Sequence, residues 1–212
     1  MSFSSPARAG SIASIALLLV TSSRSAGLPE GSAADTPNPP ISKTASDSCN
    51  VKVKRLEAYA AITEPGKGQA TQFSETEINS FLAYELREKY HPCLKSLVVK
   101  LDEANLKGVA TIDFDVLGMS SKSVLSKFIA KLFAGVHNLT VKGKLLAREG
   151  KGSFQLDEAQ FDNTTLPNFI VEEIITAVGR KQKPPIDPMQ PSQLPYKIDH
   201  VDLHQGIILV HQ

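Results

Sequence analysis

The strongest local pattern in the chain is the stretch FSETEINSFLAYEL, residues 73–86. Ser74 and Glu77 have the spacing of a capping box, in which each side chain bonds a backbone N–H at the start of a helix. Phe73 and Ile78 have the spacing of the hydrophobic staple that accompanies such a box. Apolar residues then recur every three or four positions, as on one side of an amphipathic helix. The stretch predicts a helix that begins after Ser74 and packs its apolar side on another element.

Alternation of apolar and polar residues predicts strands on both sides of this helix. Residues 51–60 (VKVKRLEAYA) begin with alternating Val and Lys, so we expect a half-buried strand there. After the helix, residues 97–101 alternate in the same way, and a turn near residues 103–108 leads into residues 109–117. In this last segment one face is apolar and the other carries Thr and Asp, which is typical of a strand with one wet face.

Residues 121–133 carry a broad apolar stripe at helical spacing and predict a second helix. Residues 139–144 and 154–161 alternate on either side of the turn REGKGS and predict a hairpin. The alternation is out of step between Leu156 and Ala159, which indicates a β-bulge there.

A third helix is predicted from residues 166–167 (LP) to Gly179, because Pro is favoured at the first helical position. Residues 181–195 contain five prolines and are not expected to form regular structure. The chain then closes with a hairpin made by residues 196–203 and 207–210 around the turn HQG.

The order of these elements predicts the fold class. Every pair of neighbouring strands is joined as a hairpin, and no strand–helix–strand crossover is needed, so the chain is expected to be α+β. We expect an antiparallel sheet of about six to seven strands packed on three amphipathic helices.

The N-terminal part differs from the rest of the chain. Residues 12–20 (IASIALLLV) form an apolar run that is too short to span a bilayer but has the length of a signal-peptide core. We expect a signal peptide at residues 1–26, a disordered linker rich in Pro, Ser and Thr at residues 27–48, and one domain at residues 49–212. The protein would then be exported, to the periplasm or cell envelope. An uncleaved membrane anchor is the alternative interpretation.

The two cysteines are Cys49 and Cys93. In an exported chain an even number of cysteines favours a disulfide, which would stabilise the fold by about 4 kcal/mol for a loop of this length. Two free buried thiols are the alternative.

The formal net charge of +1 gives no overall attraction to nucleic acid. The charges are unevenly placed, because residues 122–151 hold seven basic residues and one acidic residue, whereas residues 157–173 hold five acidic residues. Two solvated faces explain this distribution. The functional alternative is peripheral contact with an anionic membrane, in which Lys122, Lys127 and Lys131 meet headgroup phosphates.

Two groups of polar residues share a strand face in the predicted structure. His200, Asp202 and His204 alternate with apolar residues, and imidazole and carboxylate groups at this spacing can converge on a metal ion. Asp113 and Asp115 are two carboxylates of the kind that glycosidases use. A polar outer face explains both groups equally well, and we predict neither a metal site nor a catalytic residue.

No motif for nucleophilic catalysis or for a phosphate-binding loop is found in the sequence. The absence of Trp and of interleaved basic and aromatic residues argues against nucleic-acid binding. We therefore expect a non-enzymatic protein without a cofactor. We also expect a monomer.

The remaining candidate site is apolar. If the sheet and the helices do not close completely, their apolar residues line a groove for an acyl chain; otherwise the same residues form an ordinary core. The ligand-lining candidates are Ile78, Phe81, Leu82, Leu86, Phe128, Ile129, Leu132, Phe133, Phe169, Ile170 and Ile174.

Several segments together resemble small bacterial envelope proteins related to the tubular lipid-binding (TULIP) superfamily. The segments are FSETEINSFL, GVATIDFDVL, LTVKGKLLAREGKGSFQLDEAQF, LPNFIVEEII and LPYKIDHVDLHQGIILV, and the resemblance covers residues 51–212. It implies a strongly curved antiparallel sheet around the helices and a bound lipid, but it supplies no catalytic residue.

Three functions follow as hypotheses. The first is an envelope protein that binds a lipid or another hydrophobic ligand in an apolar groove. The second is a scaffold or assembly protein with a fully packed core, whose sheet edge or linker engages a partner. The third is a cystatin-like inhibitor, although the Gln-x-Val-x-Gly loop of such inhibitors is absent from the sequence.

Overall fold

The computed structural model describes residues 40–61, 68–118, 134–183 and 185–212. The predicted signal peptide, most of the predicted linker and the predicted helix at residues 121–133 lie outside the described residues. So do seven of the predicted site residues, which are Phe128, Ile129, Leu132, Phe133, Lys122, Lys127 and Lys131.

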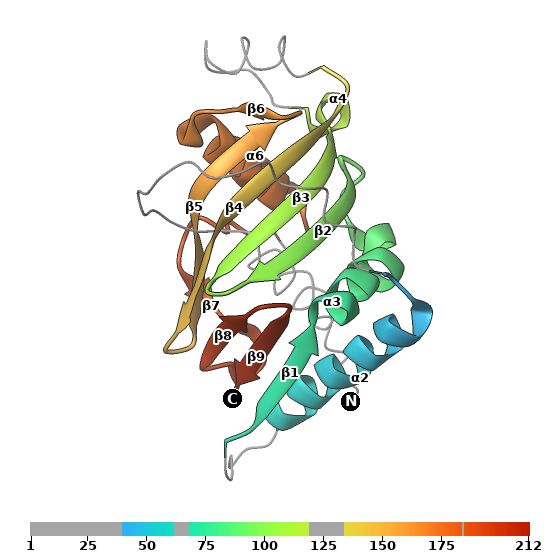
Figure 1. The fold of residues 1–212 in the computed structure, drawn as a ribbon, viewed down its shortest axis with the longest axis vertical. Helices are drawn as coiled ribbons and strands as arrows, with labels where there is room; N and C mark the ends of the chain where they lie inside the picture. Colours follow the sequence, from blue (N-terminus) through green and yellow to red (C-terminus); the bar gives the residue numbers. More distant parts are fainter. Residues whose placement is uncertain (1–39, 62–67, 119–133, 184) are drawn as a thin grey trace, which may run out of the picture.

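The described chain is α+β, as predicted, and its strands form two antiparallel sheets (Figure 1). The larger sheet has six strands: β2 (Leu94–Asp102), β3 (Asn105–Asp113), β4 (Val136–Arg148), β5 (Lys151–Phe161), β6 (Thr164–Thr165) and β7 (Ser192–Gln193). The smaller sheet has three strands in the order β1 (Ala70–Ser74), β9 (Ile207–His211), β8 (His200–His204). The large antiparallel sheet was expected. The separate small sheet was not, and it exists because β1 pairs with the C-terminal hairpin.

Four α-helices lie among the described residues, whereas the sequence predicted three. They are α2 (Lys43–Ala60), α3 (Glu75–Phe81), α4 (Phe114–Leu117) and α6 (Asn168–Lys181). A π-helical turn, η1 (Leu82–Leu86), and a 3₁₀ turn, η2 (Arg87–Lys89), continue α3, and a second 3₁₀ turn, η3 (Pro195–Lys197), precedes β8. A search of these described helices for an apolar stretch long enough to span a bilayer finds none.

The larger sheet is not strongly curved, so the expectation of a bent sheet wrapped around the helices is wrong. In Figure 1 α6 lies behind this sheet, while the smaller sheet and α2 lie below it. The core is therefore enclosed by separate elements placed on one face and at one end of the sheet. Closure does not require the sheet to bend around a helix.

Helix α2 corrects the prediction for the start of the domain. Residues 51–60, which were expected to be a strand, and residues 43–48, which were assigned to the linker, belong to this one helix. The Ser42 side chain caps it by accepting a hydrogen bond from the N–H of Ala45. The buried positions of α2 are Ser46, Cys49, Val53 and Leu56, at spacings of three and four. This helical period extends over the whole segment, whereas the Val–Lys alternation covers only four residues.

Two other predicted boundaries shift. The strand expected at residues 109–117 ends at Asp113, whose side chain caps α4. Helix α6 begins after Pro167, close to the predicted start, but it continues past Gly179. A Cβ atom at Gly179 would lie 2.4 Å from the carbonyl oxygen of Ile186, so this glycine allows the chain after the helix to pack closely on it. The bulge predicted between Leu156 and Ala159 is confirmed by a shift in the β4–β5 register.

The predicted disulfide is wrong, since both cysteines are free and buried. Cys49 lies on α2 near Glu77, whereas Cys93 directly precedes β2 near Asp113. The two thiols have different charged neighbours, because α2 packs mainly on α3, which carries Glu77. Burial raises the pKa of the Cys49 thiol to about 12 and also raises the pKa of Cys93, so both are poor nucleophiles at neutral pH.

Candidate functional site

The free edge of β2 is the most distinctive feature of the larger sheet, because a helix covers only part of it. The opposite edge of β2 pairs with β3, through a hairpin in which Asp102 lies opposite Asn105. In an antiparallel ladder the backbone groups of alternate residues point to opposite edges. Leu97, Val99 and Leu101 therefore direct their N–H and C=O groups toward the free edge.

Helix α3 starts where the sequence predicted and is held by the predicted capping box. The Oγ atom of Ser74 accepts a hydrogen bond from the N–H of Glu77 at 3.2 Å, and the Glu77 carboxylate accepts one from the N–H of Ser74 at 2.8 Å. The same carboxylate accepts hydrogen bonds from Ser48 and Lys52 on α2. Burial raises the pKa of Glu77, but the bonds from Lys52, Ser48 and Ser74 outweigh it, so that the pKa is lowered. Glu77 thus starts α3 and also ties α3 to α2.

Asn79 connects α3 to the edge strand. Its side chain is buried, and the amide donates to the carbonyl oxygen of Val99 at 2.6 Å while its oxygen accepts from the N–H of Val99 at 2.7 Å. The amide also donates to the carbonyl of Glu75 within the helix. One primary amide thereby makes the two hydrogen bonds that a neighbouring strand would make to Val99.

The next edge position, Leu101, is also satisfied. Its N–H donates to the Glu75 carboxylate at 2.7 Å, and its carbonyl accepts from the N–H of Gly206 at 2.9 Å. The carbonyl of Gly206 in turn accepts from the N–H of Glu75 at 2.9 Å. The N-terminal turn of α3 and the β8–β9 turn therefore close this part of the edge together.

Leu97 is the edge position that α3 and the β8–β9 turn do not reach with hydrogen bonds. Within the described residues, neither its N–H nor its C=O makes a hydrogen bond on the edge side, although its side chain is buried. A groove of about 310 Å³ lies beside it. The groove walls come from three parts of the chain: Ile41; Leu82, Ala83, Arg87 and Tyr90; and Ser96, Leu97 and Val98. Asn79 also lines the groove, so the groove adjoins the place where the Asn79 amide pairs with β2.

Two groove residues carry polar groups that are not used inside the described fold. The Tyr90 hydroxyl is buried and has no hydrogen-bond partner in the described part of the chain. Burial raises the pKa of Tyr90, so the hydroxyl keeps its proton and can donate or accept. Arg87 is exposed, and no ion pair is formed by it among residues 40–61, 68–118, 134–183 and 185–212.

Among the described residues, a smaller cavity of about 30 Å³ lies between the larger sheet and α6, and its lining includes Leu97, Leu139 and Ile175. Of the predicted ligand-lining residues that are described, Ile78, Phe81, Leu86 and Ile174 are buried in the core, Ile170 is partly buried, and Phe169 is 58% exposed. Leu82 is 2% exposed and borders the groove at β2.

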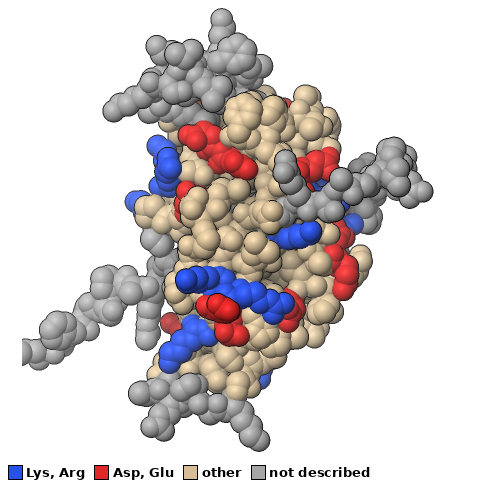
Figure 2. Space-filling model, turned by 90° about the vertical axis from the view of Figure 1, so that its left-hand side faces the viewer, with Lys and Arg blue, Asp and Glu red and all other residues tan. Residues whose placement is uncertain are grey.

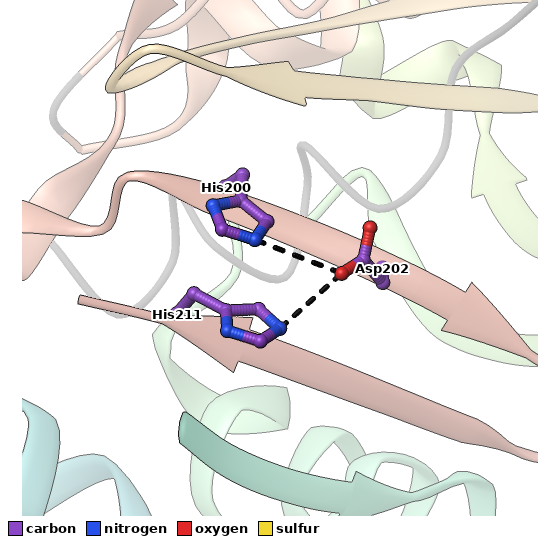
Figure 3. Close-up of side chains that lie close together, drawn as sticks. All are labelled: His200, Asp202 and His211. Carbon is purple, nitrogen blue, oxygen red and sulfur yellow. Dashed lines mark ion pairs between the residues drawn. The ribbon is translucent and has the colours of Figure 1, made fainter. Parts of the chain in front are cut away.

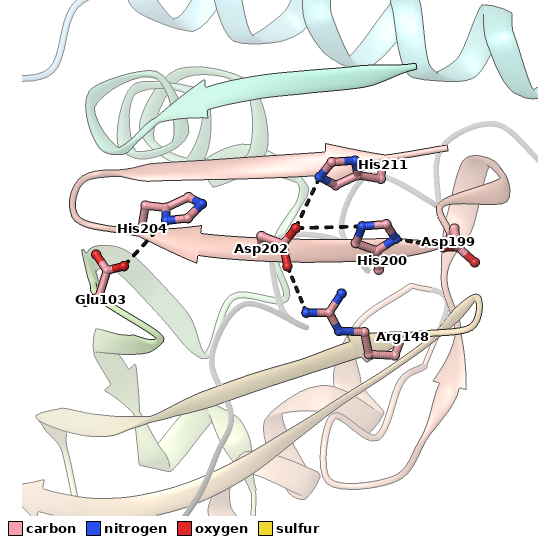
Figure 4. Close-up of polar contacts among 7 residues, drawn as sticks. All are labelled: Glu103, Arg148, Asp199, His200, Asp202, His204 and His211. Carbon is pink, nitrogen blue, oxygen red and sulfur yellow. Dashed lines mark hydrogen bonds and ion pairs between the residues drawn. The ribbon is translucent and has the colours of Figure 1, made fainter. Parts of the chain in front are cut away.

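A second cluster of functional groups lies on the smaller sheet (Figure 3). The Nε2 atom of His211 lies 3.2 Å from the Oδ2 atom of Asp202, and the Nε2 atom of His200 lies 3.7 Å from the same oxygen. The two imidazole rings are stacked, with centroids 4.1 Å apart. The sequence grouped His204 with His200 and Asp202, but His204 is 54% exposed and lies near Glu103 instead (Figure 4).

The cluster follows from the strand register. Because Gln205 and Gly206 form a two-residue turn, His200 lies directly opposite His211. Directly opposite side chains of an antiparallel pair are close neighbours, whereas His204 is four residues away along its strand. The sequence contained the signal needed to find His211. If Gln205 and Gly206 alone are taken as the hairpin loop, the register places His211 opposite His200.

The other carboxylate pair considered from the sequence has a structural role. Asp113 accepts a hydrogen bond from the N–H of Val116 and forms an ion pair with Lys95 at 3.0 Å, and these contacts lower its pKa. Asp115 lies on α4 and is exposed. The two carboxylates therefore do not share a strand face.

The face of the molecule drawn in Figure 2 carries basic and acidic side chains next to each other. Neighbouring charges of opposite sign cancel at a distance, so this face does not produce a strong field of one sign.

Comparison of the chain with protein-family models, with curated proteins and with solved structures finds no match.

Proposed function

We propose that the domain is an assembly protein that binds an extended segment of a partner protein along the open part of the β2 edge. The observation that carries this proposal is that, in the described part of the chain, the edge-facing N–H and C=O of Leu97 are unpaired beside a groove of about 310 Å³. A strand edge with free N–H and C=O groups is a template for another strand, and β-strand addition is a common mode of peptide recognition.

The groove indicates what the bound segment is like. A peptide residue opposite Leu97 would repeat the two hydrogen bonds that Asn79 makes to Val99. An apolar side chain of the peptide would rest against Leu82 and Ala83, and an acidic side chain near it would meet Arg87. Backbone bonds would supply affinity for any extended segment, while these side-chain contacts would supply the preference for an apolar residue next to an acidic one.

The lipid hypothesis requires an internal apolar space, and ligand sites for drug-sized molecules usually measure about 300–1,000 Å³. The cavity between α6 and the larger sheet is far smaller, at about 30 Å³. Within the described residues this cavity is too small for an acyl chain, which supports the assembly hypothesis over the lipid hypothesis.

The test begins with a phage-displayed library of random dodecapeptides selected against the full chain. A selected peptide, synthesised with a fluorescent label, is then titrated by fluorescence anisotropy. Ala83→Arg fills the groove, and Ala58→Arg places the same side chain on an exposed position of α2. We expect Ala83→Arg to weaken binding by at least about tenfold and Ala58→Arg to leave it unchanged.

Two further measurements complete the test. On peptide binding the Leu97 amide should become protected from hydrogen exchange, since it gains an acceptor. Native mass spectrometry of the purified chain should show no copurified lipid. Equal binding by both arginine variants would contradict the proposal, and a stoichiometric bound lipid without any selected peptide would favour the lipid hypothesis.

A further inference from the structure

We propose that His200, Asp202 and His211 form a binding site for a divalent transition-metal ion such as Zn²⁺. The nearest atoms of the three side chains lie within 4.8 Å of one another. Two imidazole nitrogens and one carboxylate oxygen are a ligand set that zinc and related ions accept, with water in the remaining position.

The spacing of the ligand atoms is close to what one ion requires. Bonds of about 2.1 Å in a tetrahedral arrangement place neighbouring ligand atoms about 3.4 Å apart. The two distances from the imidazole nitrogens to Oδ2 of Asp202 are 3.2 Å and 3.7 Å. The stacked rings must tilt away from parallel before both nitrogens point at one ion. His200 and His211 are each 27% exposed, so this rotation does not disturb the core.

The hydrogen bonding around the cluster prepares these atoms as ligands. The Asp199 carboxylate lies 2.7 Å from the Nδ1 atom of His200, and because a carboxylate only accepts, the proton of neutral His200 is held at Nδ1. The Nε2 atom then presents a lone pair toward Asp202. A carboxylate bound to the far nitrogen of a histidine is the usual outer-shell partner of a metal ligand.

Asp202 is oriented in a similar way from the other side. Arg148 at the end of β4 donates to its Oδ1 atom at 2.9 Å, which leaves Oδ2 for the two histidines (Figure 4). The Nε2 atom of His211 is buried, and within the described chain it has no hydrogen-bond partner, because its approach to Asp202 does not have hydrogen-bond geometry. Three polar atoms thus converge without bonding one another, and a cation between them would satisfy all three.

Strand pairing makes the site rigid. His200 and His211 are cross-strand partners, and Asp202 follows two residues after His200 on the same face of β8. β9 is the central strand of its sheet, with β1 on its other side. The backbone positions of the three ligands are therefore fixed before any ion arrives, which lowers the entropic cost of binding.

The experiment uses the full chain purified without a polyhistidine tag and stripped of metal with a chelator. Zn²⁺ is titrated by isothermal calorimetry, with Mg²⁺ as the control ion because magnesium prefers oxygen ligands. We expect one Zn²⁺ per chain and no heat from Mg²⁺. His200→Ala and His211→Ala should each weaken Zn²⁺ binding by at least about tenfold, since even outer-shell changes cost that much. His204→Ala is the matched control and should bind as the unchanged chain does.

Three outcomes would overturn the proposal: no Zn²⁺ binding at millimolar concentration, equal loss in His204→Ala and His200→Ala, or binding by Mg²⁺ with similar affinity. X-ray absorption of the unmodified chain loaded with Zn²⁺ gives an answer that does not depend on the folding of any variant. Two imidazole ligands with oxygen ligands support the proposal, and a spectrum of oxygen ligands alone contradicts it.

Discussion

The two halves of the β2 edge have the same backbone chemistry but different surroundings. At Val99 and Leu101 the side chains of Asn79 and Glu75, with the backbone of Gly206, satisfy every edge group. At Leu97 the described chain supplies no hydrogen-bond partner on the edge side, and a groove lies beside this residue instead. In the described chain the part of the sheet edge at Val99 and Leu101 is therefore closed by two side chains of α3 and the β8–β9 turn, and not by a further strand.

The helix changes from α-helical to π-helical close to the point where it stops making hydrogen bonds to the β2 edge. The regular α3 ends at Phe81, and the chain continues as the π-helical η1 and the 3₁₀ turn η2. π-helical turns inside helices occur often at functional sites. Here the groove begins at this turn, with Leu82 and Ala83 in its wall.

The largest expected effect comes from removing the amide that closes the edge. Asn79→Ala leaves the N–H and C=O of Val99 without partners in a buried place, so we expect the free energy of unfolding to fall by about 3 kcal/mol. Urea denaturation followed by circular dichroism measures this change. Asn168→Ala, at an exposed position of α6, is the control and should change it by less than about 0.5 kcal/mol. A small effect of Asn79→Ala would mean that water closes the edge equally well.

The second expected effect concerns the contact between α3 and α2. Glu77→Gln weakens the bonds from Lys52 and Ser48, and we expect a loss of about 2 kcal/mol at neutral pH. The pKa of Glu77 is lowered in the fold, so its stabilising contribution is present above the pKa of the unfolded chain and is lost as the pH falls through the folded pKa.

The difference in unfolding free energy between Glu77→Gln and the unchanged chain should therefore shrink as the pH falls below about 4. Urea titrations at a series of pH values measure it, with the exposed Glu88→Gln as the control. A difference that stays constant down to pH 3 would show that the charge of Glu77 is not what ties α3 to α2.

A smaller effect is expected at the start of the covering helix. Ser74→Ala removes the acceptor for the N–H of Glu77 and should lower the unfolding free energy by about 1 kcal/mol. Ser96→Ala, on the exposed face of β2, should have less than half of this effect. Equal losses of unfolding free energy in the two variants, measured by thermal or urea denaturation, would show that the capping box does not specifically stabilise the helix that closes the β2 edge.

The mildest test leaves the sequence unchanged. Hydrogen exchange measured by NMR should find the Leu97 amide exchanging at least about tenfold faster than those of Val99 and Leu101, because it has no acceptor in the described fold. Equal protection of the three amides would contradict an open edge at Leu97.

Part of the fold was predictable because it rests on residues close together in the chain. The start of α3 at Ser74, the start of α6 after Pro167, and the bulge between Leu156 and Ala159 each depend on neighbours a few positions apart. Residues 51–60 were misassigned because a short alternation at their start resembles a strand, while the helical period of α2 is visible only when the segment from Lys43 is included.

The candidate sites were only partly predictable for the same reason. The stretch FSETEINSFLAYEL predicted the helix that carries Asn79, but the partner of this side chain, Val99, is twenty residues away in the chain. His200 and Asp202 were identified by their alternation on one strand, and the error of choosing His204 instead of His211 comes from the cross-strand register. The paired cysteines were expected from their number alone, which says nothing about which elements hold them.

The amino-acid sequence by itself determined the α+β class, the capped helix after Ser74, the long hairpins and the polar face that contains His200 and Asp202. Those features follow from local periodicity and from caps, whose energies act within one or two turns of chain. Tertiary structure alone decided that the strands form two sheets, that Asn79 closes the β2 edge at Val99, and that Leu97 has no edge partner among the described residues. Such contacts join distant segments, and their partners are selected by packing of the whole domain and not by any local pattern.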